Sequence, residues 1–504
     1  MNILWIDDEI DLLKPLIMLL KEKGYNVTGV ASGDDGVSLL KKFPFDLVLL
    51  DEIMPGKDGL ASLRDIRNID TNIPVVMITK SEEEELIEKA YSVKATDYLV
   101  KPIKSQQLIS TVKRILERKD IIKRKQPEEY AKFYSSVNSS IYSDIGIEKW
   151  ISIYLDIIKW DIELHKFGDE EFRKTHNDLL WTAERQFARY IETEYPRWLL
   201  EGKGPDLSPD IIRKYVMPKL LKEKRVCFIL LDCMRYDQWL TIKPILQGDF
   251  NIEENQYISI LPSATPFARN SIFAGVFPDE ISCRFPKLWD PEENRFERDL
   301  LAMQVEEIRN MKGPVYFKIR NIKEAESLEE RARAYRKARF VSIVVNFLDI
   351  LIHQRMESQV IEEALPDEDS LREFTRMWFI KSHIYNLIRE LRDIKATIII
   401  TTDHGAIITH KPTIIEGGKT ISRNLRYKYA PVLKTNERNC IYIEEPERYR
   451  LPNGGKKYAI AKEDYYFIYP SHPERYEAEY KHTFQHGGVS MQEQILPISV
   501  LTPK

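Results

Sequence analysis

The sequence predicts a three-part α/β protein: a doubly wound parallel sheet, a helical middle, and a second, larger α/β domain. Within residues 1–119, short apolar runs that end in polar residues alternate with amphipathic helical patterns, as in a doubly wound fold. From residue 128 to about 222 the apolar residues recur at helical spacing. Beyond residue 222 buried strand patterns return, and several of them run into Asp or His.

Length and composition agree with this division. A chain of 504 residues is too long for one core and corresponds to about two to four domains. We place them at residues 1–119, 120–221 and 222–504. The formal net charge of -4 argues against a protein that coats nucleic acid.

The four cysteines and the N-terminal residues bear on the cellular compartment. The cysteines form no CxxC pair, which argues against structural disulfides and a thiolate zinc knot and favours the cytoplasm. The chain turns acidic at Asp7, too early for a signal peptide. No stretch reaches the roughly 20 apolar residues of a membrane helix. We therefore expect a cytoplasmic protein without a membrane span.

In the first domain, polar residues follow the expected strands. Strands are expected at residues 3–6, 25–30, 47–50, 75–78 and 97–100, with helices between them. Because parallel strands end at one edge of a sheet, five side chains should converge there: Asp7, Asp8, Asp51, Thr79 and Lys101. Three carboxylates in one crevice need a cation, and oxygen ligands suit Mg²⁺. A lysine and a hydroxyl beside them suit a phosphoryl group on one carboxylate.

This set resembles the CheY-like receiver domain of bacterial response regulators, over residues 1 to about 119. The resemblance implies that Asp51 accepts phosphate from a sensor histidine kinase. It also implies that Mg²⁺ is bound by Asp7, Asp8 and Asp51 together with the backbone carbonyl of Ile53.

The same resemblance assigns the switch residues. Thr79 and Lys101 would bind the phosphoryl group, and the Lys101–Pro102 peptide would be cis. Tyr98 would be the aromatic residue of the phosphorylation switch. The alternative is a receiver-like domain that is never phosphorylated. Because all the required positions are filled, phosphorylation is favoured.

The sequence predicts a helical bundle in the middle of the chain, and this segment carries no specific motif. Trp150, Tyr154, Trp181 and Phe187 recur at helical spacing, which favours a bundle core over a base-stacking platform. A basic run at residues 119–125 is more often a solvated helix face than a nucleic-acid contact. No helix-turn-helix is apparent, so direct DNA reading is not the favoured output.

In the last domain, strand-like runs lead into candidate metal ligands. Strands are expected at residues 225–231, 258–261, 340–347 and 397–402, and a helix should open at residue 269. Asp349 and His353 are four residues apart, so a helical turn puts both on one face. Asp403 and His404 are adjacent, and we expect a turn permitted by Gly405 to direct both toward one metal.

The complete set of candidate ligands contains carboxylates, imidazoles and one hydroxyl: Asp232, Thr265, Asp349, His353, Asp403, His404 and His486. Nitrogen and oxygen ligands without thiolate favour Zn²⁺ or Mn²⁺. Any one histidine of the nine is more often a surface or core residue, but the joint pattern indicates a catalytic metal site.

The order of these residues resembles the alkaline phosphatase superfamily, and within it the PglZ domain, over about residues 222–504. The resemblance implies two zinc ions and assigns their ligands. One zinc would be bound by Asp232, Thr265, Asp403 and His404, and the other by Asp349, His353 and His486. Thr265, in the sequence Pro-Ser-Ala-Thr, would be the nucleophile.

Two further residues are expected to touch the substrate. Arg269 and Asn270 lie just after Thr265 at the expected helix start, where they would contact non-bridging phosphate oxygens. For Arg269 an ordinary surface arginine is the competing interpretation.

Two cations can stabilise both the attacking and the leaving oxygen of an in-line displacement. No surplus of metal ligands is apparent, which favours a phosphodiester over the doubly charged monoester.

A receiver, a helical segment and a PglZ domain in this order resemble the PorX-type response regulators tied to type IX secretion. The resemblance implies a di-zinc phosphodiesterase acting on cyclic or linear oligonucleotides, and dimerisation when Asp51 is phosphorylated. The alternative is a regulator that does not bind DNA and acts through a sigma factor or the secretion machinery, with a structural metal site. In either case the helical middle would couple the two ends of the chain.

Overall fold

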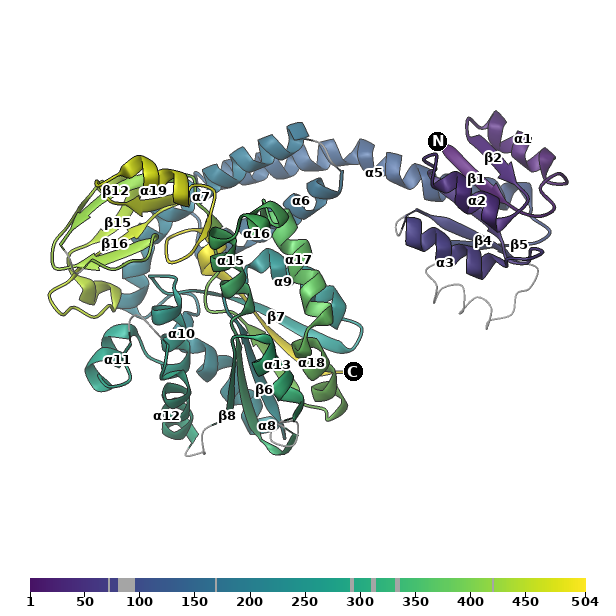
Figure 1. Ribbon diagram of the computed structural model, residues 1–504. Coiled ribbons are helices and arrows are strands. Elements are labelled where there is room, and N and C mark those ends of the chain that lie inside the picture. The colour runs from purple at the N-terminus through teal and green to yellow at the C-terminus, as the bar shows by residue number, and fades with distance from the viewer. Residues whose placement is uncertain are drawn as a thin grey trace. The chain divides into compact units, whose positions relative to one another are not determined.

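The computed structural model describes residues 1–70, 73–79, 96–167, 170–290, 294–309, 314–330, 336–418 and 421–504 (Figure 1). The chain forms two compact units, residues 1–133 and 134–504. None of the helices in these ranges is long and apolar enough to cross a membrane.

The first unit contains the expected parallel sheet. Its strand order is β2-β1-β3-β4-β5, and all neighbouring strands are parallel. The strands are β1 Asn2–Ile6, β2 Asn26–Val30, β3 Leu47–Asp51, β4 Val75–Thr79 and β5 Asp97–Val100. The helices are α1 Lys14–Glu22, α2 Gly33–Leu40, α3 Gly59–Ile69 and α5 Ser105–Ser140. The fourth helix of the predicted alternation would lie outside the described residues.

Alternation along the strands builds a core on each face of this sheet. Ile3 and Trp5 of β1 pack in the cluster that includes Leu108 and Val112 of α5. Leu4 and its alternate neighbours pack in the cluster on the opposite face, with α3. The central strands β1, β3 and β4 are therefore buried on both faces, as their apolar runs predict.

The second unit begins with the predicted helical segment. Its helices are α6 Ile147–Phe167, α7 Glu170–Glu201 and α8 Met217–Lys222, with short turns of helix at η1 Ser208–Asp210 and η2 Ile212–Val216. The ring centroids of Trp150 and Phe187 lie 5.6 Å apart in an edge-on arrangement. These aromatic side chains are buried core residues, as the helical spacing predicts.

A six-stranded mixed sheet forms the centre of the second unit, in the order β7-β19-β10-β6-β9-β8. Strands β10, β6, β9 and β8 are parallel, and β19 is antiparallel to both of its neighbours. The strands are β6 Val226–Leu231, β7 Phe250–Ile258, β8 Val315–Ile319, β9 Phe340–Val345, β10 Thr397–Thr401 and β19 Ile495–Pro503.

Helices pack on both faces of this sheet (Figure 1). One face is covered by α8, α10 and α12, whose apolar side chains join alternate residues of β6 in a single core cluster. The helices from residue 236 onward are α9 Tyr236–Leu246, α10 Thr265–Ala274, α11 Pro278–Arg284, α12 Glu297–Arg309, α13 Ile322–Glu330, α15 Phe347–Glu357, α16 Gln359–Ala364, α17 Glu368–Lys381, α18 His383–Asp393, α19 Pro473–Tyr480 and α20 Met491–Gln494.

Between β10 and β19 the chain forms an additional region of short strands that the sequence did not predict. Two three-stranded sheets have the orders β14-β12-β17 and β13-β16-β15, and β11 pairs with β18. The strands are β11 Ile407–Ile408, β12 Lys411–Gly417, β13 Tyr427–Ala430, β14 Leu433–Thr435, β15 Cys440–Ile443, β16 Lys457–Ala461, β17 Tyr465–Ile468 and β18 Phe484–Gln485. Strands β12, β15 and β16 of this region are labelled at the left of Figure 1.

Two predicted boundaries near Thr265 were wrong. The strand expected at residues 258–261 ends at Ile258, because the amides of Ser259 and Ile260 donate to Gln494 and Ser208 in place of a neighbouring strand. The helix expected to open at Arg269 begins four residues earlier, at Thr265, with Pro266 in its first turn. Proline is favoured there because the first helical N–H groups need no partner within the helix.

Candidate metal centre and phosphoacceptor site

The metal-ligand candidates of the second unit follow three neighbouring strands. Asp232 comes directly after β6, and Asp403 follows β10 by two residues. Asn346 caps α15, which follows β9 and carries Asp349 in its first turn. Because β6 lies between β10 and β9 and all three are parallel, their carboxyl ends bring these side chains to one edge.

The first cluster consists of Asp232, Asp403 and His404, all fully buried. His404 Nε2 lies 3.7 Å from Asp232 Oδ1 and 3.7 Å from Asp403 Oδ2. The same nitrogen lies 2.9 Å from Thr265 Oγ1. Each of the three residues offers a ligand atom within 4.8 Å of the others. The threonine hydroxyl therefore lies directly at this cluster.

Gly405 serves this cluster in a different way from the one expected. Its backbone does not have a positive φ angle. Instead, a Cβ atom at this position would lie 2.0 Å from the carbonyl oxygen of Gln492. The Gly405 amide also donates a hydrogen bond to the Glu493 carbonyl, at 3.0 Å. Glycine is required because the loop that carries Asp403 and His404 passes so close to another backbone segment.

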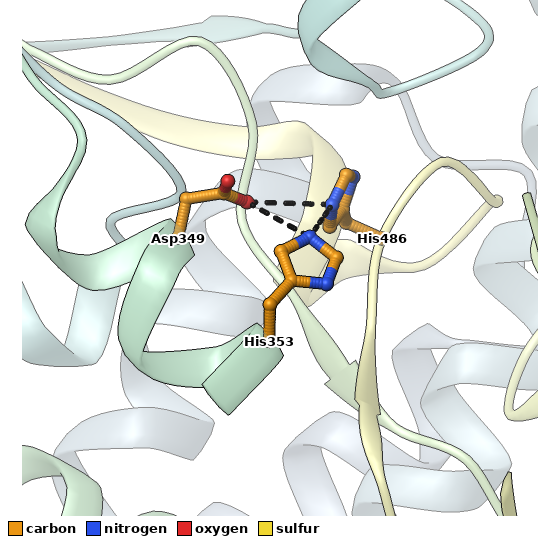
Figure 2. Close-up of side chains that lie close together, drawn as sticks. All are labelled: Asp349, His353 and His486. Carbon is orange, nitrogen blue, oxygen red and sulfur yellow. Dashed lines mark hydrogen bonds and ion pairs between the residues drawn. The ribbon is translucent and has the colours of Figure 1, made fainter. Parts of the chain in front are cut away.

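The second cluster consists of Asp349, His353 and His486 (Figure 2). Asp349 Oδ1 lies 3.5 Å from His353 Nε2 and 3.4 Å from His486 Nε2, and the two nitrogens are 3.5 Å apart. The first two side chains project from α15, and the third reaches them from the loop after β18. The rings of His404 and His486 stack with centroids 4.3 Å apart, so the two clusters are adjacent.

Strand pairing and close packing hold the loop of His486. β18 pairs with β11, which follows directly on the loop of His404. Gly487 has a φ of 112°, and a Cβ atom there would lie 2.6 Å from the ring of Tyr427. Ser263 Oγ donates to the Gly488 carbonyl at 2.7 Å. Because Ser263 is two residues before Thr265, this bond joins the loop that leads to Thr265 to the loop of His486.

Arg269 forms ion pairs with both carboxylates of the first cluster. Its guanidinium is completely buried and pairs through Nη2 with Asp232 Oδ2 and through Nε with Asp403 Oδ2 at 2.8 Å. Nη1 lies 3.2 Å from Glu297 Oε1. We predicted that Arg269 would contact phosphate oxygens, but the structure directs these nitrogens to three carboxylates. Arg269 is thus placed as a positioning residue for two metal ligands.

Asn270 is also placed differently from the expectation. It is buried, and its amide donates to the Pro266 carbonyl at 2.9 Å within α10. It does not line the cavity over the clusters. Because the helix begins at Thr265, residues 269 and 270 lie in its second turn and not at its N-terminus.

Burial and neighbouring charges shift the pKa values of several groups in the two clusters. Burial raises the pKa of Asp232 well above its usual range, although Arg269 opposes this shift. Burial also works to raise the pKa of Asp403, but Arg269 and His404 outweigh it and the pKa is lowered. For His486, burial together with the nearby His404 lowers the pKa to about 3. His486 is therefore neutral, which is the form that binds metals.

The donor atoms fit divalent cations. Asp232 Oδ1 is buried and accepts no hydrogen bond, a state that costs free energy in a protein interior. In the second cluster one carboxylate oxygen and two imidazole nitrogens are directed at one another (Figure 2). A cation within each cluster would give these atoms the partner they lack.

A cavity of about 710 Å³ lies over both clusters. Sequence reasoning missed several of its lining residues, because no motif marks them: Asn294, Arg295, Lys318, Arg320, Asn346, Asn424 and Tyr427. Asn346 donates to Asp232 Oδ2 at 2.6 Å. Asn346 follows directly on β9, and a polar residue near the end of an apolar, strand-like run is the one signal that could have identified it.

Helix α7 contacts both loops of the site. The hydroxyl of Tyr195 accepts a hydrogen bond from the Leu261 amide at 3.2 Å, four residues before Thr265. Glu184 Oε2 accepts one from the Met491 amide at 2.8 Å, five residues after His486. Both α7 side chains are fully buried. The helical segment is thus part of the support of the metal clusters.

The first unit has its own cluster of carboxylates at the ends of β1 and β3. Asp7, Asp8 and Asp51 each offer an oxygen within 4.8 Å of the others. Asp7 and Asp51 are buried and Asp8 is exposed. Lys101 Nζ lies 2.8 Å from Asp51 Oδ2 and 3.0 Å from Asp7 Oδ2. Burial raises the pKa of Asp51, and the bond from Lys101 opposes this shift.

The predicted switch residues surround this cluster. Thr79 ends β4, next to the strand of Asp51, and is buried. Tyr98 of β5 is half-buried and packs on the core. The side chain of Ile53 is exposed, two residues after Asp51. The Lys101–Pro102 peptide is cis, as predicted.

Three protein-family models match the chain one after another. A response regulator receiver domain matches residues 3–113, and a PorX response regulator linker domain matches residues 120–199. A BREX system PglZ alkaline phosphatase-like domain matches residues 211–501, more than half of the chain.

Similar curated proteins match about a quarter of the chain. The transcriptional regulatory protein BaeR of Escherichia coli is 37% identical over 117 residues, 23% of this chain and 48% of that protein. CtrA, a cell cycle transcriptional regulator of Caulobacter vibrioides, is 30% identical over 118 residues, 23% of this chain and 51% of CtrA. The chain thus spans about half the length of these relatives. Among solved structures, a two-component response regulator from Clostridium difficile is 32% identical and matches 23% of this chain and 96% of its own, with a TM-score of 0.23.

Proposed function

The chain belongs to the PorX-type response regulators with a PglZ alkaline phosphatase-like domain, and from this premise we propose that it is a zinc-dependent phosphodiesterase controlled by phosphorylation of Asp51. The observation that carries the proposal is the 2.9 Å separation between Thr265 Oγ1 and His404 Nε2. This contact supports a role for the Thr265 hydroxyl as nucleophile at the first cluster, and the second cluster adjoins it through the stacked ring of His486.

Each residue has a defined role in this proposal. Asp232, Asp403 and His404 hold one zinc together with Thr265, and the second cluster holds the other. Nitrogen and oxygen donors without thiolate suit Zn²⁺. When bound, the two cations stabilise negative charge on the attacking and the leaving oxygen.

The protein's own residue Thr265 carries out the displacement at phosphorus. Thr265 Oγ1 attacks phosphorus, the bond to the leaving alcohol breaks, and the proton of the threonine hydroxyl ends on that alcohol. The phosphoryl group, still esterified to the second alcohol, is carried on the threonine. Water then attacks this intermediate, releases the phosphomonoester and restores the hydroxyl. Thr265 opens a ten-residue helix, whose N-terminus favours the negative charge that develops there.

Metal removal tests the proposed function directly. The purified full chain should contain zinc and hydrolyse a chromogenic phosphodiester faster than the matching monoester. Chelation should abolish this activity, since no other group in the site supplies the charge of two cations, and added zinc should restore it. The panel should extend to nucleotide monoesters, diesters and cyclic oligonucleotides. Full activity in the metal-free protein would contradict the proposal.

The two clusters should lose metal independently. In His404→Ala, the first cluster loses a ligand while Asp349, His353 and His486 keep theirs. We expect about one equivalent of zinc per chain in place of about two, because the first cluster would keep only two carboxylates and a hydroxyl and would lose its one nitrogen ligand. Metal analysis gives the stoichiometry, and circular dichroism shows whether the fold persists. Loss of both metals, or of neither, would show that the ligand sets are assigned incorrectly.

A receiver domain takes its phosphoryl group from a phosphodonor such as a histidine kinase. We propose that Asp7, Asp8, Asp51 and the Ile53 carbonyl bind Mg²⁺ there, because oxygen donors suit this ion. Thr79 and Lys101 would hold the phosphoryl group, and Tyr98 would shift in response. Two receivers would then associate into a homodimer.

Sedimentation measures this response. With Mg²⁺ and a phosphate analogue, we expect the full chain to shift from monomer to dimer. Asp51→Asn lacks the phosphoacceptor carboxylate and should remain monomeric under the same conditions. An unchanged profile of the parent protein would refute phosphorylation-controlled dimerisation.

The match to the PorX linker domain supports a physiological setting in type IX secretion. We propose that cyclic or linear oligonucleotides are the substrate, and that a sigma factor or a secretion component is a protein partner. If the protein acted only through such a partner, an Asp51 phospho-mimetic would change partner binding equally in the parent and in Thr265→Ala, and neither would hydrolyse the diester panel.

A further inference from the structure

The cavity over the metal clusters has a basic wall. Apart from the metal ligands, Thr265, Pro266, Asn346 and the buried Arg269, it is lined by Asn294, Arg295, Lys318, Arg320, Asn424 and Tyr427. These six include three cationic side chains and no carboxylate. Binding sites for organic ligands commonly have volumes of about 300–1,000 Å³. At about 710 Å³, the cavity has room for much more than one phosphate group.

The three cations lie on one wall. Lys318 belongs to β8, the edge strand of the central sheet, and Arg320 is two residues further on. Alternate residues of an extended chain face the same side. Lys318 Nζ also donates to the Asn294 carbonyl at 3.1 Å, which ties the segment of Arg295 to this strand. Two separate parts of the chain therefore build one basic surface.

The two arginines can exchange their present partners for phosphate. Arg295 Nε lies 2.7 Å from Asp290, and Arg320 Nη2 lies 3.0 Å from Glu324. The arginine side chains are 66% and 63% exposed, whereas Asp290 and Glu324 are 10% and 30% exposed. Because the guanidinium groups reach solvent, their ion pairs are screened and can be rearranged toward a phosphate. A guanidinium binds phosphate through two parallel hydrogen bonds. Lys318 differs, because it is only 25% exposed and pairs with the largely buried Glu297 at 3.1 Å.

The positive charges of Arg295, Lys318 and Arg320 come in addition to the two metal ions that would bind the scissile phosphodiester. A diester carries a single negative charge, which two bound cations would neutralise. We propose that Arg295 and Arg320, with Lys318 at their base, form a second phosphate subsite that binds a phosphate of the substrate other than the scissile one. This inference rests on the proposed phosphodiesterase function. It narrows the substrate class to phosphodiesters that carry at least one further phosphate.

Hydrolysis and binding of two dinucleotides test the subsite in the full chain. One is a thymidine dinucleotide with a 5′-phosphate, and the other is the same dinucleotide without it. The zinc-loaded parent should prefer the phosphorylated form in kcat/KM. In the double variant Arg295→Gln/Arg320→Gln we expect this preference to fall by about tenfold, mainly through KM, because a charge-assisted contact to phosphate is lost.

Arg284→Gln is the matched control. Arg284 is another exposed arginine that pairs with a carboxylate, Glu280, at 2.9 Å, but it does not line the cavity. Its substitution should leave the preference as in the parent. An unchanged preference in the double variant would overturn the subsite. Equal loss on both dinucleotides, with metal content intact, would also overturn it, because the arginines would then serve the scissile phosphate.

Binding to Thr265→Ala separates this inference from the proposed function. This variant lacks the nucleophile, so its affinity for each dinucleotide can be measured without turnover. Tighter binding of the phosphorylated form, reduced by the arginine substitutions, would support the subsite even if the parent hydrolysed no diester. Equal affinity for both forms would overturn the subsite even if the parent proved to be an active phosphodiesterase.

Discussion

Thr265→Ala should reduce kcat for phosphodiester hydrolysis by at least about 10³-fold, the scale seen when a catalytic nucleophile is removed. The substitution deletes the Oγ1 atom that lies 2.9 Å from His404 Nε2. The fold should persist, because the Thr265 carbonyl still accepts its hydrogen bond from Asn294 Nδ2 at 2.9 Å. Zinc content should be close to that of the parent, since three protein ligands of the first cluster remain.

Stopped assays on the chromogenic diester, with metal analysis of the same samples, measure this effect. Thr265→Ser is the control, because it keeps a hydroxyl at the same position and should keep most of the activity. If Thr265→Ala hydrolysed the diester as fast as the parent, another group would be the nucleophile. If it lost its zinc, the threonine would be chiefly a metal ligand.

Arg269→Met should destabilise the metal-free protein by about 3–5 kcal/mol, the usual effect of removing one partner of a buried ion pair. Asp232, Asp403 and Glu297 all face this guanidinium, and the residue is completely buried. Methionine fills most of the volume, so the loss comes from the charge. The three carboxylates would be left close together in a medium that solvates them poorly.

Zinc should compensate for much of this loss. A cation in the first cluster supplies the positive charge that the variant lacks, so added zinc should raise the unfolding temperature of Arg269→Met more than that of the parent. Thermal unfolding in chelator and in zinc measures both effects. Arg284→Met, at an exposed arginine, should unfold like the parent in both conditions. An equal response to zinc in Arg269→Met and the parent would mean that Arg269 does not balance the metal-ligand carboxylates.

The sequence could predict which side chains gather because strand ends and helical spacing are local properties. Asp7, Asp51 and Asp232 each follow a buried apolar run, and parallel strands bring such positions to one edge. Asp349 and His353 needed only the four-residue spacing of a helix. The first sheet was predictable for the same reason, since its central strands β1, β3 and β4 are buried, mostly apolar runs.

What the sequence could not predict depends on contacts between distant segments. Nothing in the spacing of Arg269 indicates that it meets Asp232 and Asp403, because those contacts span separate strands. The early helix start could have been recognised from Pro266, since proline favours the first helical turn. The role of Gly405 depends on the carbonyl of Gln492, which is far along the chain. Similarly, the basic wall combines Arg295 with a strand that begins about twenty residues later.

The contacts of α7 also bear on how this protein has been assembled in evolution. Tyr195 and Glu184 lie within the match to the linker family, residues 120–199, but they hold backbone amides on the PglZ side, which begins at residue 211. A recombination event that joined this PglZ segment to a foreign linker would remove both supports from the loops of Thr265 and His486. We therefore expect an exchange of the PglZ segment between relatives to preserve function only when α7 is exchanged with it.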